Sequence, residues 1–197
     1  MTSEMSVATL IADLISEDDT LRRSAESSLV NFSFETLLPE FSALLRSPEK
    51  RIRNRGMELF CCMGSVSIPS LALLLSDDEW TVRYRAAEGL GIIGGDVACS
   101  LLVPALQDKR DHVRYMAAKG LGISSYTQSA DAVSLLLEDE NEFVRASAAR
   151  ALGQMNLAAY RPSIEKALAR ETYEKTRVVM MEALLCLGGK DRWSYDP

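Results

Sequence analysis

Apolar residues recur along this chain in two kinds of segment that alternate from one end to the other. The first kind is short and rich in leucine, and the second kind begins near an arginine. In both kinds the apolar residues lie three or four positions apart, which is typical of one face of a helix. The leucine-rich segments are Val7–Ile15, Thr36–Leu45, Ile68–Leu75, Cys99–Leu106, Ala130–Leu137 and Pro162–Ala169. No segment alternates strictly between apolar and polar residues, so we expect helices and no strands.

Prolines and acidic residues mark the expected helix boundaries. Pro39 and Pro69 each lie 14 residues before an arginine of the second kind of segment, which suits the first turn of a helix. Pro104 lies only 10 residues before Arg114, inside an expected helix, so we expect a kink or a late helix start there. Acidic turns such as Ser76–Glu79 place negative charge at the start of the following helix, where it is favourable.

A repeated pattern organises the chain. Three segments, Trp80–Gly91, Asp111–Gly122 and Glu142–Gly153, share the order Val-Arg-x-x-Ala-Ala-x-small-Leu-Gly. With three weaker copies, the arginines of the pattern are Arg22, Arg53, Arg83, Arg114, Arg145 and Arg177, spaced 31, 30, 31, 31 and 32 residues apart. A constant period of this length predicts stacked repeats. We therefore expect a single all-α domain over residues 1–197, an α-solenoid of about six stacked helical hairpins. The expected repeats are approximately 5–33, 34–65, 66–95, 96–126, 127–157 and 158–189, with a C-terminal tail at 190–197.

This pattern resembles the short HEAT-like repeats of the phycobilin-lyase type. The resemblance covers nearly the whole chain and is strongest over residues 68–157. It implies a right-handed α-solenoid, and it implies a binding scaffold for most members and chromophore handling or enzymatic activity for a minority. The iron-dependent hydroxylases built from such repeats carry paired His-Glu dipeptides. This chain has no His-Glu dipeptide, so the sequence argues against that branch.

Residue types in the second helix follow their distance from the pattern arginine, which we number position 0. At about 100° per residue, positions −1, 3, 7 and 10 share one side of the helix. In the third repeat they are Val82, Ala86, Leu90 and Ile93, and they predict the stripe that packs in the core. Positions 4, 6 and 8 hold glycine or alanine in the third, fourth and fifth repeats, so we expect neighbouring repeats to approach closely there.

The six pattern arginines, which we call the arginine column, have two interpretations. In the structural one, each stem packs between repeats and each guanidinium binds acidic turn residues or helix-end carbonyls. Asp77, Asp108 and Asp139 each lie six residues before their arginine, as this interpretation needs. In the functional one, the column is a row of anion-binding sites. The recurrence in every repeat, whatever surrounds it, favours the structural interpretation.

Charge and composition narrow the classes of function. The chain has 22 Lys and Arg against 28 Asp and Glu, a formal charge of −6. This balance disfavours nucleic-acid binding by the basic cluster Lys50–Arg55, because such binding needs many phosphate contacts. The longest uncharged stretch, Leu59–Ser76, is interrupted by Gly64 and Pro69, so we expect no membrane span. Four cysteines without framework spacing indicate free thiols and a cytoplasmic protein.

Catalytic and metal-binding chemistry finds little support. His112 is the only histidine, and it occupies a slot that holds Thr81 and Phe143 in the neighbouring repeats, so we expect an exposed, variable residue. Cys61 and Cys62 are adjacent and the other cysteines are remote, so zinc spacing is absent. We expect no catalytic residue, no cofactor and no metal.

Positions 1, 2, 5 and 9 of the second helix lie opposite the core stripe, and we expect them to face solvent on the concave face. Aromatic, Met and Ile residues lie there between charged residues, a composition typical of an interface core. We therefore predict a non-enzymatic protein–protein interaction scaffold. The predicted partner-binding residues are Arg55, Glu58, Tyr84, Arg85, Glu88, Ile92, Tyr115, Met116, Lys119, Ile123 and Arg150.

Two alternatives to the scaffold remain open. A bilin lyase-like or chromophore-handling protein is permitted by the family resemblance, but it needs an acid or base in a cleft. The predicted surface offers Glu58 and Glu88 for that role and no histidine. Nucleic-acid binding through the basic cluster is the weaker alternative.

The last repeat carries larger residues where earlier repeats are small. Position 4 is Met181 and position 8 is Leu185. Trp193 and Tyr195 of the tail could fold back and cover these side chains. The alternative is a weak homodimer through the same end, since an uncovered apolar patch marks an interface.

Overall fold

The computed structural model describes residues 6–187, and within this range the regular elements are all helices. The α-helices are α1 (Val7–Leu14), α2 (Asp19–Ser28), α3 (Phe34–Leu45), α4 (Lys50–Met63), α5 (Ile68–Leu74), α6 (Trp80–Ile93), α7 (Gly95–Leu102), α8 (Asp111–Ile123), α9 (Ala130–Leu135), α10 (Glu142–Met155), α11 (Arg161–Arg170) and α12 (Glu174–Cys186). Short 3-10 helices adjoin them: η1 (Leu29–Asn31), η2 (Gly64–Ser67), η3 (Pro104–Gln107), η4 (Thr127–Ser129), η5 (Leu136–Glu138) and η6 (Ala158–Tyr160). The all-α fold predicted from the periodicity is confirmed.

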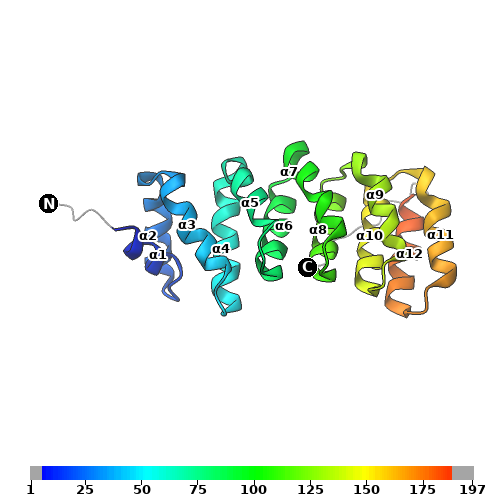
Figure 1. Cartoon of the computed structure of the whole chain (residues 1–197), viewed down its shortest axis with the longest axis horizontal. Helices are drawn as coiled ribbons and strands as arrows, with labels where there is room; N and C mark the ends of the chain where they lie inside the picture. Colours follow the sequence, from blue (N-terminus) through cyan, green and yellow to red (C-terminus); the bar gives the residue numbers. More distant parts are fainter. Residues whose placement is uncertain (1–5, 188–197) are drawn as a thin grey trace. The chain divides into compact units, whose positions relative to one another are not determined.

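Consecutive helices pair as hairpins, which Figure 1 shows in chain order. α1 packs on α2, α3 on α4, α7 on α8, α9 on α10 and α11 on α12. The fold is an α-solenoid of stacked helical hairpins, as the repeat predicts. The chain divides into two compact units, and the boundary falls between Arg85 and Ala86, inside α6.

In the first unit, side chains of α1, α3 and α4 form the core. Leu10 and Leu14 of α1 are fully buried. The rings of Phe41 and Phe60 meet edge to face with their centroids 5.9 Å apart, a favoured arrangement for aromatic pairs. The helix pair α3–α4 is thereby fixed by large buried rings.

The three prolines singled out in the sequence have different outcomes. The prediction for Pro39 is wrong: α3 begins at Phe34, so Pro39 lies inside the helix. The reason is Ser33, whose side chain accepts the amide N–H of Thr36 and caps the helix five residues before the first turn that we expected. Pro69 lies in the first turn of α5, as predicted.

The prediction of a kink or a late helix start at Pro104 is wrong, because the helix begins early and ends before this residue. α7 stops at Leu102, and the 3-10 helix η3 begins at Pro104. Proline has no amide N–H to continue the helical hydrogen bonds, and its ring clashes with the carbonyl of the preceding turn. The leucine-rich segment of this repeat is therefore split into two short pieces.

One stretch of the described residues, Lys50–Leu74, is long and apolar enough to cross a membrane by length and composition. Gly64 interrupts it with a φ of 60°, a conformation that other residues adopt rarely. The stretch is thus divided into α4, η2 and α5. It forms a corner between α4 and α5.

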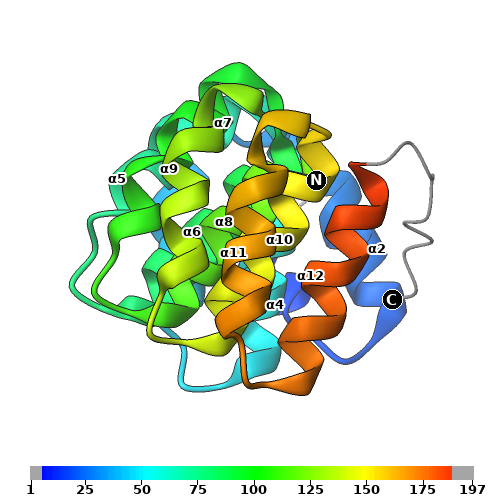
Figure 2. The ribbon, with the colours of Figure 1, turned by 90° about the vertical axis from the view of Figure 1, so that its right-hand side faces the viewer.

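In the second unit, the second helices of successive hairpins lie side by side. α8 packs against α10, and α10 against α12 (Figure 1). α11 lies beside α12 as the other helix of the same hairpin (Figure 2). Positions −1, 3 and 7 are buried in α8 and α10, which confirms the predicted core stripe at these positions: Val113, Ala117, Leu121, Val144, Ala148 and Leu152. Position 10 is less uniform, because Ile93 and Ser124 are half-buried and Met155 is buried.

Candidate functional site

The arginine column closes the turn between the two helices of each hairpin. In every repeat, Nη1 of the arginine donates to the carbonyl oxygen of the residue six positions earlier, over 2.6 to 2.9 Å. These bonds run from Arg22 to Ser16, Arg53 to Ser47, Arg83 to Asp77, Arg114 to Asp108, Arg145 to Asp139 and Arg177 to Glu171. Arginines engaged by the carbonyls of their own turn support the structural interpretation of the column.

Two arginines of the column also bind the turn of the following repeat. Nε and Nη2 of Arg114 donate to the two carboxylate oxygens of Asp139 over 2.7 and 2.8 Å. Arg145 binds Glu171 in the same way, over 2.6 and 2.9 Å. The Glu171 side chain is 1% exposed. Hydrogen bonds from Arg145 hold the pKa of Glu171 below its ordinary value, although burial acts to raise it.

We expect Arg114→Ala to lower the free energy of unfolding by about 1–3 kcal/mol, because the buried Asp139 carboxylate then loses its two guanidinium donors. Urea unfolding followed by circular dichroism measures this change. Lys109→Ala removes an exposed cation from the preceding turn, and it should change stability by less than about 0.5 kcal/mol. Equal stability of the two variants would contradict a structural role for Arg114.

Position 8 of each second helix in the second unit lies against position 6 of the next, a contact that we call the seam. A Cβ atom added at the position-8 glycine would lie under 3.0 Å from the facing Cα atom in each of three cases. The pairs are Gly91 with Gly120 at 2.8 Å, Gly122 with Ala151 at 2.7 Å, and Gly153 with Ala183 at 2.9 Å. The small residues therefore serve close backbone approach, as their pattern indicates.

The prediction that Met116 faces solvent is wrong, since Met116 is only 5% exposed. It occupies position 2, one helical turn before Gly120 at position 6, so both residues point toward the preceding repeat. Ser147, at position 2 of the next repeat, is buried too, and its Oγ donates to the carbonyl oxygen of Tyr115 over 3.1 Å. Position 2 thus belongs to the seam.

In the first unit, the predicted partner-binding residues interact with one another. Nη1 of Arg55 donates to Oε2 of Glu58 over 2.9 Å. Arg85 donates to the side-chain oxygen of Asn54 in the preceding repeat, and its guanidinium lies 5.3 Å from the centre of the Tyr84 ring. Glu58 is exposed, whereas the other three predicted residues are half-buried.

In the second unit, the remaining predicted residues form what we call the second-helix strip. Ile92 and Ile123, both at position 9, are 64% and 56% exposed, and Arg150 is exposed as well. The other members are half-buried. The strip consists of Glu88, Ile92, Tyr115, Lys119, Ile123 and Arg150.

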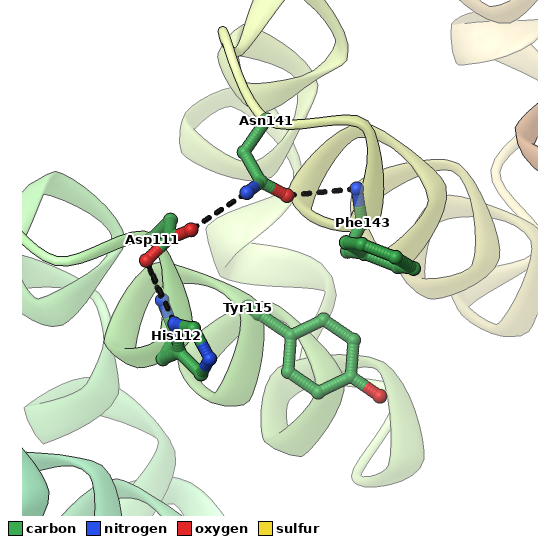
Figure 3. Close-up of a pocket in the computed structure, with 5 residues that line it drawn as sticks. All are labelled: Asp111, His112, Tyr115, Asn141 and Phe143. Carbon is green, nitrogen blue, oxygen red and sulfur yellow. Dashed lines mark hydrogen bonds and ion pairs between the residues drawn. The ribbon is translucent and has the colours of Figure 1, made fainter. Parts of the chain in front are cut away.

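The sequence did not predict an open pocket of about 280 Å³ between the first turns of α8 and α10. Figure 3 shows the rings of His112, Tyr115 and Phe143 around it, with Asp111 and Asn141 on one side. Of the residues that line this pocket, Tyr115 alone belongs to the partner-binding residues predicted from the sequence. His112 and Phe143 occupy the same slot, position −2, in successive repeats, and an aromatic ring in that slot twice in succession could have indicated the pocket.

Asp111 is held in place by bonds on both oxygens (Figure 3). Oδ1 accepts the amide N–H of His112 over 2.8 Å and also lies 2.8 Å from Nδ1 of the same residue. Oδ2 accepts a bond from Nδ2 of Asn141 over 2.6 Å. The bond to the His112 ring lowers the pKa of Asp111, so the carboxyl is ionised at neutral pH.

The described residues hold no group of three or more His, Cys, Asp or Glu side chains that could bind a metal. The cysteines carry free thiols: Cys61 is half-buried, Cys62 is exposed, and Cys99 and Cys186 are buried.

At the last described helix, Val178, Met181 and Leu185 are 41%, 41% and 51% exposed on α12. Trp193 and Tyr195, which we expected to cover this helix, lie outside the described residues.

A family model for HEAT repeats matches residues 64–121 and, again, residues 105–185. The two matches together span more than half of the chain. No protein sequence with curated annotation matches it significantly.

Several solved structures are similar in fold. A chain in the complex of CpcE and CpcF of phycocyanin lyase from Nostoc shares 18% identity, with 76% of this chain and 98% of that chain covered and a TM-score of 0.68. Human deoxyhypusine hydroxylase shares 19% identity over 93% of this chain and 74% of that chain, with a TM-score of 0.55. Kap121p bound to Ste12p shares 15% identity over 91% of this chain and 22% of that chain, with a TM-score of 0.67.

Proposed function

The chain belongs to the HEAT-repeat family, and on this premise we propose that it is a non-enzymatic scaffold that binds a protein partner along the second-helix strip. The observation that carries the proposal is the pair Ile92 and Ile123. Both are large apolar side chains, both are more than half exposed, and both occupy position 9 in successive repeats. Apolar residues at a constant spacing between charged ones suit a partner segment that runs across the repeats.

Solved structures of similar fold support a protein as the partner. Kap121p is bound to Ste12p in its structure, and CpcE is in a complex with CpcF. The charged members of the strip, Glu88, Lys119 and Arg150, are of both signs. This mixture suits a polar rim around an apolar contact and does not suit a polyanion such as nucleic acid.

The test compares the double variant Ile92→Ser/Ile123→Ser with wild type in affinity capture from extracts of the source cells, quantified by mass spectrometry. A partner held by the strip should be depleted about tenfold or more, because central apolar residues contribute most of the energy of an interface. Val97→Ser is the matched control, since Val97 is 64% exposed, like Ile92, but lies on the first helix α7.

Melting temperatures of all three proteins should agree closely, because exposed substitutions usually change stability by less than about 0.5 kcal/mol. Depletion by both the double variant and the Val97→Ser control would place the binding elsewhere. Capture of the same proteins in the same amounts by the double variant would contradict the proposal.

Bilin handling is a second candidate, favoured by the structural similarity to the phycocyanin lyase chain. Incubation with a linear tetrapyrrole followed by gel filtration distinguishes the two. Visible absorbance that elutes with the protein would favour the chromophore, and absorbance that elutes only at small-molecule volume would favour the scaffold.

A further inference from the structure

Three aromatic rings surround the pocket between α8 and α10. His112 and Tyr115 lie one turn apart on α8, and Phe143 lies in the first turn of α10 (Figure 3). Phe143 is 62% exposed, an unusual environment for so large an apolar side chain. Ring faces carry negative partial charge and attract cations placed over them.

The charge at the pocket has the sign that a cation requires. Among the described residues that line the pocket, Asp111 is the only carboxylate and none is a lysine or arginine; Arg110 and Arg114 act on Asp111 from outside this lining. The Asp111 side chain is 31% exposed, so an incoming group can reach it. The bonds to His112 and Asn141 fix the carboxylate in position before any ligand arrives.

An anion would find few available hydrogen-bond donors at the pocket, although two helices begin there. The amide N–H of His112 is bound by Asp111. The amide N–H groups of Phe143 and Val144 are both bound by Oδ1 of Asn141, over 2.9 and 3.3 Å. These three amides, of the kind that usually bind anions at a helix start, are therefore satisfied within the chain.

The number of hydrogen bonds that Asp111 can still accept favours an ammonium group over a guanidinium group. Oδ1 already takes two contacts from His112, whereas Oδ2 takes one from Asn141. A carboxylate oxygen accepts about two bonds, so one acceptor position on Oδ2 remains. A lysine ammonium can place one of its three donors on this position and leave the other two to water, but the guanidinium fork of arginine is strongest when it binds both oxygens.

We propose that this pocket takes a lysine side chain, with its methylene stem between the three rings and its ammonium group on Oδ2 of Asp111. The inference rests on the proposed function, because the lysine would belong to the bound protein segment. The chemistry of the pocket can nevertheless be measured without that partner.

The test titrates the isotope-labelled full chain with Nα-acetyl-lysine methylamide and follows amide signals by NMR. Signals of His112, Tyr115 and Phe143 should shift together along one saturable curve. The norleucine analogue has a similar apolar stem but no charge, so it should bind at least about threefold more weakly. The arginine analogue should bind more weakly than the lysine compound.

Two variants and a control locate the effect. Phe143→Leu keeps an apolar wall but removes the ring, and Asp111→Asn removes the charge; each should weaken lysine binding at least about threefold. Phe143→Leu should leave the weak norleucine binding unchanged. Glu140→Gln removes the same charge from a nearby side chain that is 88% exposed and does not line the pocket, and it should have little effect.

Equal affinities for the lysine and norleucine compounds, or shifts that spare these three residues, would overturn the inference. Equal weakening by Asp111→Asn and Glu140→Gln would overturn the role of Asp111. The result is separable from the scaffold proposal. If Ile92→Ser/Ile123→Ser loses partner capture but the lysine compound causes no NMR shifts, the lysine-binding proposal alone is refuted. If the lysine compound binds but the double variant captures the partner normally, the proposal for the second-helix strip is refuted.

Discussion

Glu171→Ala is expected to lower the free energy of unfolding by about 3–5 kcal/mol, the usual cost of removing one partner from a buried ion pair. The variant leaves the Arg145 guanidinium without its bidentate partner. It also leaves the amide N–H groups of Thr172 and Tyr173, which Oε1 of Glu171 accepts over 2.9 and 3.0 Å, without an acceptor. Urea unfolding followed by circular dichroism measures the loss.

The loss should be uneven along the chain, because each repeat contacts only its neighbours. Hydrogen exchange should accelerate most in α11 and α12, the hairpin that Glu171 joins to α10. Glu182→Ala, an exposed substitution on α12, is the control and should change stability by less than about 0.5 kcal/mol. Uniformly faster exchange throughout residues 6–187 would contradict this account.

The same pair predicts how stability depends on pH. The pKa of Glu171 in the folded protein is lower than its ordinary value of 4.5, so its stabilising contribution is fully present above pH 4.5. It is lost as the pH falls through the lowered pKa, where the folded protein also takes up the proton. Glu171→Gln does not titrate, so its deficit against wild type should shrink below pH 4.5. A deficit that stays constant down to acid unfolding would exclude the charge as its cause.

Gly122→Leu is the second change with a large expected effect, a loss of about 3 kcal/mol or more. Its Cβ alone would lie 2.7 Å from Cα of Ala151 and 2.8 Å from Cβ of the same residue. Backbone atoms cannot move aside as a flexible side chain does, so α8 and α10 would have to separate. Thermal unfolding measures the effect.

Gly122→Ala tests whether crowding at the seam outweighs the helix propensity of alanine. Helix propensity alone predicts a gain of about 0.5–1 kcal/mol for alanine over glycine in a helix. The crowded seam predicts a net loss instead. Ile123→Ala is the control at the adjacent, exposed position and should be nearly neutral. If Gly122→Ala is more stable than wild type, α8 and α10 lie farther apart at the seam than the described distances.

Periodic features of this fold could be predicted from the sequence because each repeat presents the same evidence again. Val113 and Val144 are buried at the same position, and the arginine column binds the same carbonyl in all six repeats. The helix period predicts the direction of a side chain around the helix axis to within about the rotation of one residue, and this is accurate enough to identify the core stripe. Position 2 lies near the boundary between solvent and seam, so the period alone could not place Met116.

Features that depend on one repeat alone, or on two together, were harder to predict. Ser33 places the start of α3 ahead of Pro39 through hydrogen bonds to the amide and the hydroxyl of Thr36. The lysine pocket needs His112 from one helix and Phe143 from the next, and in sequence each looks like a variable surface residue. Only the side-by-side arrangement of α8 and α10 gives the two rings a common space.

In the second unit, the contacts that a repeat makes with the repeat after it differ from those that it makes with the repeat before it. We call these two sets of contacts its edges. Arg114 and Arg145 reach forward to a carboxylate of the following repeat, whereas Ser147 reaches back to a carbonyl of the preceding one. A tandem copy of residues 117–147 would carry both edges with it: Arg145 would meet the copied Asp139, and the copied Ser147 would meet the carbonyl oxygen of Ala146. Whole repeats are therefore interchangeable modules, and a binding surface built on them can lengthen one module at a time without a new kind of joint.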